Sequence, residues 1–310
     1  MIPVLIDTDP GIDDALALLL AWGSPEITVE AVTTVAGNVS LRAATRNLDR
    51  LLALRRPSPP PRVGVGAAGP LVRPLVTAEH YHGEDGLGDL ADWPTETDEE
   101  SVAADAARTR APELIVEMAE RRGRALTLVA LGPLTNLALA LDLAATRLAS
   151  VGRVVVMGGA VDVPGNVTPA AEFNMHVDPD AAARVFAAGL ALDLVPLDVT
   201  RRTVLTSAEL EAALARAPGR LADRLAAFTA HAFHVDRARG GRGIALHDPL
   251  AVGVAVDPGV VAWERARVGV GPDGETRREP GPANCRIARS VDARRFVAMF
   301  LTRLCPAGAP

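Results

Sequence analysis

Short apolar runs alternate along the chain with longer segments that have the spacing of amphipathic helices. The apolar runs are rich in Val, Leu and Ile and predict strands at 4–6, 28–35, 126–130, 154–157 and 192–197. The longer segments predict helices at 13–22, 40–54 and 134–141. Strands that alternate with helices indicate βαβ units and a mainly parallel sheet. The runs lack clean polar alternation, which indicates burial on both sides of the sheet. We therefore predict an α/β fold in one domain over residues 1–310, an open, mainly parallel sheet with helices on both faces.

The segments between these units have distinct compositions. Residues 56–61 are proline-rich and predict a stiff connector, whereas residues 94–105 are acidic and predict a solvated surface stretch. Residues 70–88 contain several glycines together with His80, Tyr81 and His82, and we expect them to form a loop over a binding site.

One apolar stretch, residues 126–145, is long enough to suggest a membrane span. Gly132-Pro133 interrupts it, and Thr135, Asn136 and Asp142 would each be costly in lipid. A buried strand followed by a helix fits this stretch better, so we predict no membrane association. The N-terminal residues show neither a basic region nor a cleavage site of a signal peptide, and we expect a cytoplasmic protein.

Composition excludes several classes of function. The formal net charge of −6 argues against a nucleic-acid partner, which would require a basic surface. The chain contains no lysine, which excludes Schiff-base chemistry and phosphate-binding P-loops. Cys285 and Cys305 lie close to the C-terminus without metal-ligand spacing, so we expect two structural thiols in a reducing compartment.

The clearest chemical signal follows the first predicted strand. Asp7, Asp9, Asp13 and Asp14 fall within eight residues, between an apolar strand and an apolar helix. Asp13 or Asp14 could cap the helix, but capping does not account for Asp7 and Asp9. So many neighbouring carboxylates would repel one another without a cation. Ligands that are all oxygen favour a hard cation, calcium or magnesium, over zinc.

Polar groups also follow other predicted strands. Open parallel sheets bind ligands at the carboxyl ends of their strands, and the groups in question are Asn38, Gly158-Gly159, Asn166, Glu172, Asn174 and the pair His247-Asp248. Taken singly, Asn38 could be a turn residue, Asn174 a side-chain cap, Asp248 a helix N-cap and His247 a structural histidine. Together, carboxylates, amides and an imidazole along one sheet edge suit a metal ion and a polyhydroxylated sugar.

The motifs that contain these residues resemble a known family. The opening DTDPGIDDALALLLA closely resembles the inosine–uridine nucleoside hydrolases in length and spacing. The later motifs follow in family order, and they are TTVAGN, HGEDGLG, ALGPLTNLA, VMGGA, EFN and HDPLA. The resemblance covers nearly the whole chain. It implies an enzyme that hydrolyses the N-glycosidic bond of ribonucleosides, releasing ribose and a free purine or pyrimidine base, in a Rossmann-like fold.

The resemblance also implies roles for individual residues. A calcium ion would be bound by the carboxylates of Asp9, Asp14 and Asp248 and by the backbone carbonyl of Leu131. Asp9 would also be the general base that takes a proton from the calcium-bound water. The ribose-binding residues would be Asp13, Asn38, Glu172 and Asn174, with Asn166 and Met157 lining the sugar pocket.

Two histidines are candidates for handling the leaving base. His247 matches the family position linked to this step, and His82 lies in the flexible loop that the resemblance places over the site. The chemistry agrees with such a group, because a purine or pyrimidine anion leaves poorly without a donor. Carboxylates close to the ribose would stabilise the oxocarbenium-like charge that develops during cleavage.

The chain departs from the family in its aromatic residues. Family members with a defined base preference often have tyrosines on the helices before the His-Asp pair, but Tyr81 is the one tyrosine of this chain. The segment 228–242 offers His231, Phe233 and His234 instead. Base specificity therefore cannot be transferred from the family.

Two other classes of function remain as alternatives. A phosphatase of the haloacid dehalogenase type also begins with an apolar strand and Asp-x-Asp, and there Asp7 would be the nucleophile and Asp9 the acid. Such enzymes usually hold phosphate with a basic residue, often lysine, and do not require Asp13-Asp14 or the distal His-Asp pair. A nucleoside-binding protein without catalysis is the second alternative. The resemblance further implies a homo-oligomer, a tetramer or a dimer.

Overall fold

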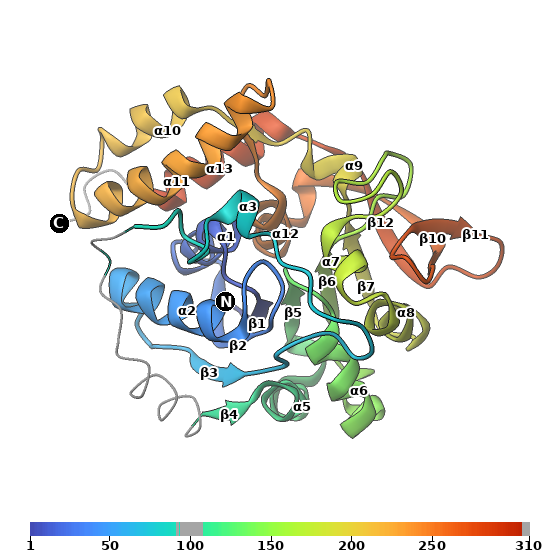
Figure 1. The fold of residues 1–310 in the computed structure, drawn as a ribbon. Coiled ribbons are helices and arrows are strands. Elements are labelled where there is room, and N and C mark those ends of the chain that lie inside the picture. The colour runs from blue at the N-terminus through green and yellow to red at the C-terminus, as the bar shows by residue number, and fades with distance from the viewer. Residues whose placement is uncertain (91–92, 94–107, 306–310) are drawn as a thin grey trace.

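A ten-stranded sheet forms the centre of the molecule in the computed structural model, which describes residues 1–90, 93 and 108–305. The sheet order is β11-β10-β12-β7-β6-β5-β1-β2-β3-β4 (Figure 1). Its strands are β1 (Ile2–Thr8), β2 (Ile27–Thr34), β3 (Arg62–Val65), β4 (Thr109–Arg110), β5 (Thr127–Ala130), β6 (Arg153–Met157), β7 (Leu192–Val195), β10 (Val261–Val270), β11 (Thr276–Glu279) and β12 (Cys285–Val291). A separate antiparallel pair consists of β8 (Val204–Leu205) and β9 (Ile244–Ala245).

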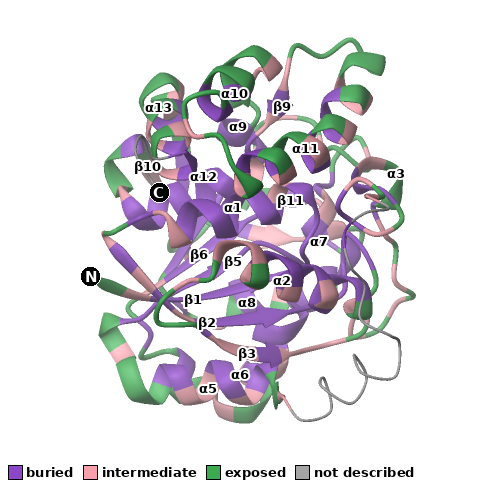
Figure 2. Ribbon diagram, turned by 90° about the vertical axis from the view of Figure 1, so that its left-hand side faces the viewer, coloured by how far each residue is buried: buried purple, intermediate pink, exposed green. Residues whose placement is uncertain are grey.

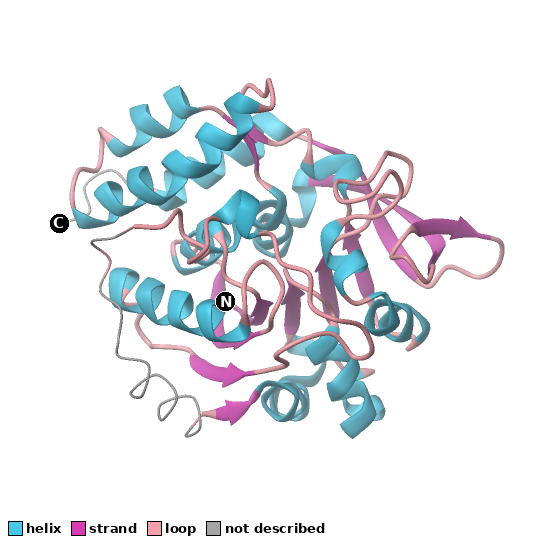
Figure 3. Ribbon diagram, viewed as in Figure 1, coloured by secondary structure: helices cyan, strands magenta, loops and turns pink. Residues whose placement is uncertain are grey.

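Helices connect the strands and cover the sheet on both sides (Figure 3). The α-helices are α1 (Ile12–Trp22), α2 (Leu41–Arg55), α3 (Glu79–His82), α5 (Ala111–Arg122), α6 (Thr135–Leu148), α7 (Phe173–Val177), α8 (Pro179–Ala187), α9 (Leu197–Thr200), α10 (Ser207–Leu214), α11 (Arg220–Ala238), α12 (His247–Val256) and α13 (Ala293–Leu304). Short 3₁₀ turns occur at η1 (Gly123–Ala125) and η2 (Pro258–Val260).

The predicted mainly parallel sheet is confirmed. The strands from β4 across to β12 run parallel, and β10 and β11 add an antiparallel hairpin at one edge. The predicted strands are all present, shifted by a residue or two at their ends. One sheet takes strands from Ile2 to Val291, as the prediction of one domain requires.

Each side of the sheet packs against its own set of helices. In β1, Val4 and Ile6 face the apolar cluster that includes α1, α2, α11, α12 and α13, whereas Leu5 faces the cluster of α5, α6 and α8. This double burial explains why the strand sequences are almost wholly apolar. Figure 2 shows the central strands in the buried colour between the two helical layers.

Helix α1 has an unusual position for an element that carries two acidic residues. It is buried along almost its whole length between the sheet and neighbouring helices such as α12. A helix that is apolar on all sides belongs inside a protein, and Asp13 and Asp14 therefore enter the interior with it. Their position in the first turn places both carboxylates at the carboxyl end of β1.

The apolar stretch 126–145 forms β5 and part of α6, as predicted. Along the described part of the chain, no helix combines the length and the apolar character needed to cross a membrane. The predicted acidic surface stretch 94–105 lies outside the described residues. The hairpin of β10 and β11 was not predicted, because its strands carry many charged residues and show no continuous apolar run.

Candidate active site

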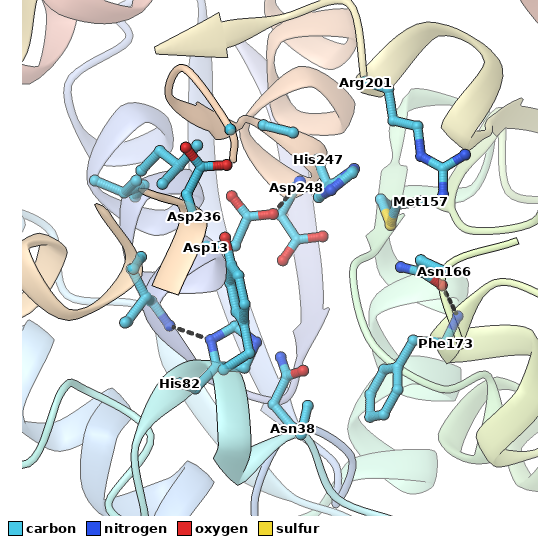
Figure 4. Close-up of a pocket in the computed structure, with 18 of the residues that line it drawn as sticks. Asp13, Asn38, His82, Met157, Asn166, Phe173, Arg201, Asp236, His247 and Asp248 are labelled. Atoms are coloured by element: carbon cyan, nitrogen blue, oxygen red, sulfur yellow. Dashed lines mark hydrogen bonds between the residues drawn. The ribbon is translucent and has the colours of Figure 1, made fainter. Parts of the chain in front are cut away.

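A pocket of about 470 Å³ opens at the carboxyl ends of four adjacent strands, β6, β5, β1 and β2. Helices α3, α7, α11 and α12 and the loop after β6 complete its walls (Figure 4). The predicted site residues that line the pocket are Asp13, Asn38, His82, Leu131, Met157, Asn166, Glu172, Asn174, His247 and Asp248. The fold thus gathers residues from widely separated parts of the sequence into one cavity.

Asp9 and Asp14 are fully buried, and neither is among the residues that line the pocket. Both oxygens of Asp14 accept hydrogen bonds, Oδ1 from the hydroxyl of Thr8 and Oδ2 from Gly11 N (3.1 Å) and Asn38 Nδ2 (2.9 Å). Asp14 therefore caps the first turn of α1, as the capping alternative proposed.

Asp9 differs because one of its oxygens lacks a partner. Asn38 N donates to Oδ2 at 2.6 Å, but Oδ1 is buried and accepts no hydrogen bond. Gly37 and Gly132 lie against this carboxylate, and a Cβ on either residue would come within 2.1 Å and 2.5 Å of its oxygens. Glycine at both positions thus allows the backbone to approach Asp9 closely.

The buried carboxylates disfavour one another's ionisation. Burial, followed by the charge of Asp14, raises the pKa of Asp9 well above its ordinary value. Burial likewise raises the pKa of Asp13 and of Asp248, and the pKa of Asp248 is raised further by Asp14, Asp13, Asp9 and Glu172. Opposite charge placed among these groups would relieve the repulsion.

The carboxylates do not already form a closed metal cage. Within the described ranges, no three His, Cys, Asp or Glu side chains are grouped closely enough to constitute one. The backbone oxygen of Leu131 accepts a hydrogen bond from Asn174 Nδ2 at 2.5 Å. A carbonyl oxygen has two lone pairs, so this bond leaves Leu131 one further acceptor position.

Glu172 has a structural function in addition to its place in the pocket. Its carboxylate caps α7 by accepting hydrogen bonds from Asn174 N (3.0 Å) and Met175 N (3.2 Å), and it also binds Gly159 N at 2.9 Å. Burial raises its pKa. Glu172 therefore fixes the turn after β6 relative to α7 while contributing negative charge to the cavity.

His82 is anchored to the first turn of α1. The residue ends α3 and is buried, and its Nδ1 accepts a hydrogen bond from Ile12 N at 3.0 Å. Because burial lowers its pKa to about 4, the ring is neutral at pH 7 and its proton resides on Nε2. The predicted loop over the site is therefore packed onto α1 at this residue.

His247 begins α12 next to Asp248 and faces the same cavity. Its Nδ1 shares a hydrogen bond with the hydroxyl of Thr200 at 2.7 Å. Burial, with the charge of Arg201, lowers the pKa of His247 to about 4. Both candidate histidines are thus neutral at physiological pH. The adjacent backbone N–H of Asp248 donates to Asp13 Oδ2 at 3.1 Å, which connects α12 to α1.

Asp7, like Asp9 and Asp14, does not line the pocket, and its hydrogen bonds point to other elements. Its Oδ1 accepts hydrogen bonds from Thr33 and from Asn136 Nδ2 (2.8 Å), which connect β1 to β2 and α6. Burial raises its pKa to about 7. Asp7 therefore connects the end of β1 to β2 and α6 and does not form part of the cavity wall.

Sequence reasoning missed one wall of the pocket. Arg201, Asp236 and Arg239 line it, from the end of α9 and from α11 with the turn that follows it. Tyr81 of α3 also lines the pocket, and it belongs to the loop that was expected over a binding site. The guanidinium of Arg239 lies 5.7 Å from the centre of the Tyr81 ring. Their spacing in the sequence gave no signal, because α11 reaches the pocket through tertiary packing.

Comparisons with known proteins agree with this geometry. The sequence matches the family described as inosine-uridine preferring nucleoside hydrolase over residues 4–298. It is 36% identical over 319 residues to the pyrimidine-specific ribonucleoside hydrolase RihA of Salmonella agona, covering 98% of each chain. The structure is similar to a purine-preferring ribonucleoside hydrolase from Gardnerella vaginalis, with a TM-score of 0.88, 30% identity and 98% coverage of both chains. A plant nucleoside hydrolase gives a TM-score of 0.88 at 34% identity, covering 98% of this chain and 99% of the other.

The family match takes in every motif from the first carboxylates to the His247-Asp248 pair. The structural similarity extends over the same length, so it concerns the whole fold rather than a shared substructure. The chain therefore belongs to the family of inosine-uridine preferring nucleoside hydrolases, which are N-glycosyl hydrolases.

Proposed function

We propose that this protein hydrolyses the N-glycosidic bond of ribonucleosides with the help of a bound calcium ion, releasing ribose and the free base. The observation that carries the proposal is the unpartnered Oδ1 of Asp9, enclosed among buried carboxylates beside a cavity of about 470 Å³. A buried, unpaired carboxylate oxygen is costly, and a cation is the simplest partner for it.

The residues present suit a hard divalent cation. Asp9, Asp14 and Asp248 would hold it with the carbonyl of Leu131, a donor set made only of oxygen atoms, as calcium prefers. When bound, the ion would orient a water molecule and lower its pKa. Asp9 could also have a second role, because the two glycines next to its carboxylate, Gly37 and Gly132, bring no side chain against it.

The other residues would act on the substrate directly. Asp13, Asn38 and Asn174 present acceptors and donors to the ribose hydroxyls, with Met157 and Asn166 along the sugar side of the cavity. The negative charge of Asp13 and Glu172 would stabilise the positive charge that develops on the ribose as the bond breaks. Asp9 would take the proton from the attacking water.

The leaving base needs a proton donor, and the two histidines are suited to that task in different ways. His82 offers Nε2–H because Ile12 occupies its Nδ1. His247 shares its Nδ1 with Thr200, and its other nitrogen is the one available to a ligand. We propose His247 as the donor to the base, with His82 as the second candidate.

The base itself remains unassigned in this proposal. Relatives with 36% and 30% identity are named for opposite preferences, pyrimidine-specific and purine-preferring. The family assignment gives no support to the phosphatase alternative. A homo-oligomeric assembly and a cytoplasmic location stay predictions.

The proposal can be tested with a reducing-sugar assay over a panel of purine and pyrimidine ribonucleosides, in calcium and after exhaustive chelation. Release of ribose that depends on calcium is the expected result. Binding of nucleosides without turnover would favour the non-catalytic alternative. Full activity after chelation would refute the role of the metal.

A further inference from the structure

The loop that follows β6 carries Asn166 into the pocket, yet it has little burial to hold it in place. Pro164, Asn166 and Val167 are all exposed. Within the loop, Asn166 Oδ1 accepts a hydrogen bond from Phe173 N at 2.9 Å. The loop is also closed by backbone hydrogen bonds from Gly165 N to Pro169 O and from Asn166 N to Ala171 O, both at 3.1 Å. Exposed segments with few apolar contacts open easily, and hydrogen bonds to a more rigid neighbour therefore add to those within the loop.

That neighbour is the turn formed by α9 and Arg201, directly after β7. Asp198 is buried and binds the start of the loop, accepting hydrogen bonds from Val161 N (3.0 Å) and Asp162 N (2.9 Å). Arg201 binds the other part, donating from Nη1 to Pro164 O and from Nη2 to Gly165 O, both at 2.7 Å. Figure 4 shows Arg201 on the side of the pocket that also carries Asn166.

The same turn also contacts the opposite side of the site. Thr200, which precedes Arg201, shares the hydrogen bond with His247 Nδ1. Residues 197–201 therefore connect the sugar side of the pocket to the histidine at the start of α12. The two carbonyls that Arg201 binds belong to Pro164 and Gly165, the residues immediately before Asn166.

We propose that Arg201 is a positioning residue for ribose binding, which acts through Asn166 by fixing the backbone of residues 164–165. This inference rests on the proposed function, in which Asn166 lies along the sugar. A planar guanidinium suits the task because its two nitrogens can bind two adjacent carbonyls at once. A lysine ammonium lacks that fixed fork.

The test compares Arg201→Gln with Arg202→Gln. Both arginines are exposed and adjacent, and each substitution removes one positive charge, but no side-chain contact connects Arg202 to the loop. We expect Arg201→Gln to raise KM for a ribonucleoside, and the Kd for free ribose by calorimetry, about tenfold, the equivalent of about 1.4 kcal/mol. Arg202→Gln should match the wild type, and Arg201→Lys should lie between the two.

A double-mutant cycle with Asn166→Ala tells positioning from a general structural effect. If Arg201 acts through Asn166, Arg201→Gln should add little once Asn166 is truncated, because the two effects are coupled. Equal losses from Arg201→Gln with and without Asn166 would overturn the proposal, and so would equal KM values for the two glutamine variants. If Arg201→Gln does not fold, as judged by circular dichroism, Arg201→Lys takes its place in the cycle.

The outcome can be separated from that of the proposed function. Ribose binding requires no turnover, so a wild-type protein that binds ribose but hydrolyses no nucleoside would refute the proposed activity while the cycle still tests Arg201. A wild-type protein that neither binds ribose nor hydrolyses a ribonucleoside would overturn both.

Discussion

His247→Ala offers the sharpest test of how the leaving base is stabilised. The imidazole lines the pocket, shares its Nδ1 with Thr200 and adjoins Asp248, one of the proposed calcium ligands. Two explanations for its position compete. Either the ring donates a proton to the departing base, or it merely holds the start of α12 so that Asp248 is presented to the metal.

The expected loss in kcat for His247→Ala depends on the protonation state of the imidazole. With a pKa of about 4, about one His247 in a thousand is protonated at pH 7. A neutral imidazole must then donate N–H to the base as the bond breaks, rather than meet it as a preformed cation. General-acid assistance typically contributes about 10²–10⁴-fold, or about 2.7–5.5 kcal/mol of the activation barrier. We expect a loss in kcat of that size for a natural ribonucleoside.

The assay compares two ribosides whose leaving groups differ strongly in how easily they depart. A natural ribonucleoside requires assistance, whereas p-nitrophenyl riboside leaves as a stable phenolate and should react with His247→Ala almost as with the wild type. The same substrates tested on His82→Ala show which of the two imidazoles assists departure.

The result that would refute the proton-donor role is equally specific. If His247 only holds Asp248 in place, its removal should weaken calcium binding and slow both substrates by the same factor. Equal losses together with a higher Kd for calcium would therefore rule out general-acid assistance by His247.

The remaining predictions concern the metal, the base and the anchored histidine. Chelation should abolish turnover and lower Tm, and calcium at a hundredfold excess over its Kd should add about 2.7 kcal/mol of stability by mass action; a Tm that calcium does not change would contradict this. Asp9→Ala should lower kcat by far more than tenfold. A loss of tenfold or less, which corresponds to a change of at most about 1.4 kcal/mol in the activation barrier, would exclude Asp9 as the base. Asn38→Ala should be milder, but should also weaken calcium affinity because its amide holds Asp14 at 2.9 Å, which calorimetry can measure. His82→Ala leaves the Ile12 N–H without its acceptor and should cost about 1–3 kcal/mol in denaturant unfolding, whereas His82→Asn can keep that bond. The lowered pKa of His82, about 4, means that below about 6.5 the unfolded chain binds a proton that the folded chain does not. Its stabilising contribution is therefore complete above about pH 6.5 and should decline as the pH falls towards 4, and an acid profile of Tm unchanged in His82→Asn would contradict this assignment.

The sequence by itself determined the architecture and predicted ten of the residues that line the pocket. Strands buried on both faces must be apolar throughout, so β1, β5 and β6 could be recognised without knowing their neighbours. Parallel strands place their carboxyl ends at one edge, and the residues that follow them therefore had to converge. This reasoning predicted that Asn38 and Asn174 lie together, and the family resemblance added Leu131 and Met157; all four line the pocket.

Only the tertiary structure decided what each polar group does within that site. Asp7 and Asp9 are two residues apart in one motif, and each keeps one buried oxygen without a hydrogen-bond partner. The other oxygen of Asp7 binds Thr33 and Asn136, whereas that of Asp9 binds the backbone N–H of Asn38 beside the pocket. The difference arises from which chain segments pack against each carboxylate, and periodicity cannot report such contacts. For the same reason, the sequence did not predict that Asp236 lines the pocket or that Arg201 binds the backbone of the loop after β6. Local sequence patterns determine secondary structure and burial, whereas hydrogen-bond partners and shifts in pKa depend on neighbours that are distant in the chain and adjacent only after folding.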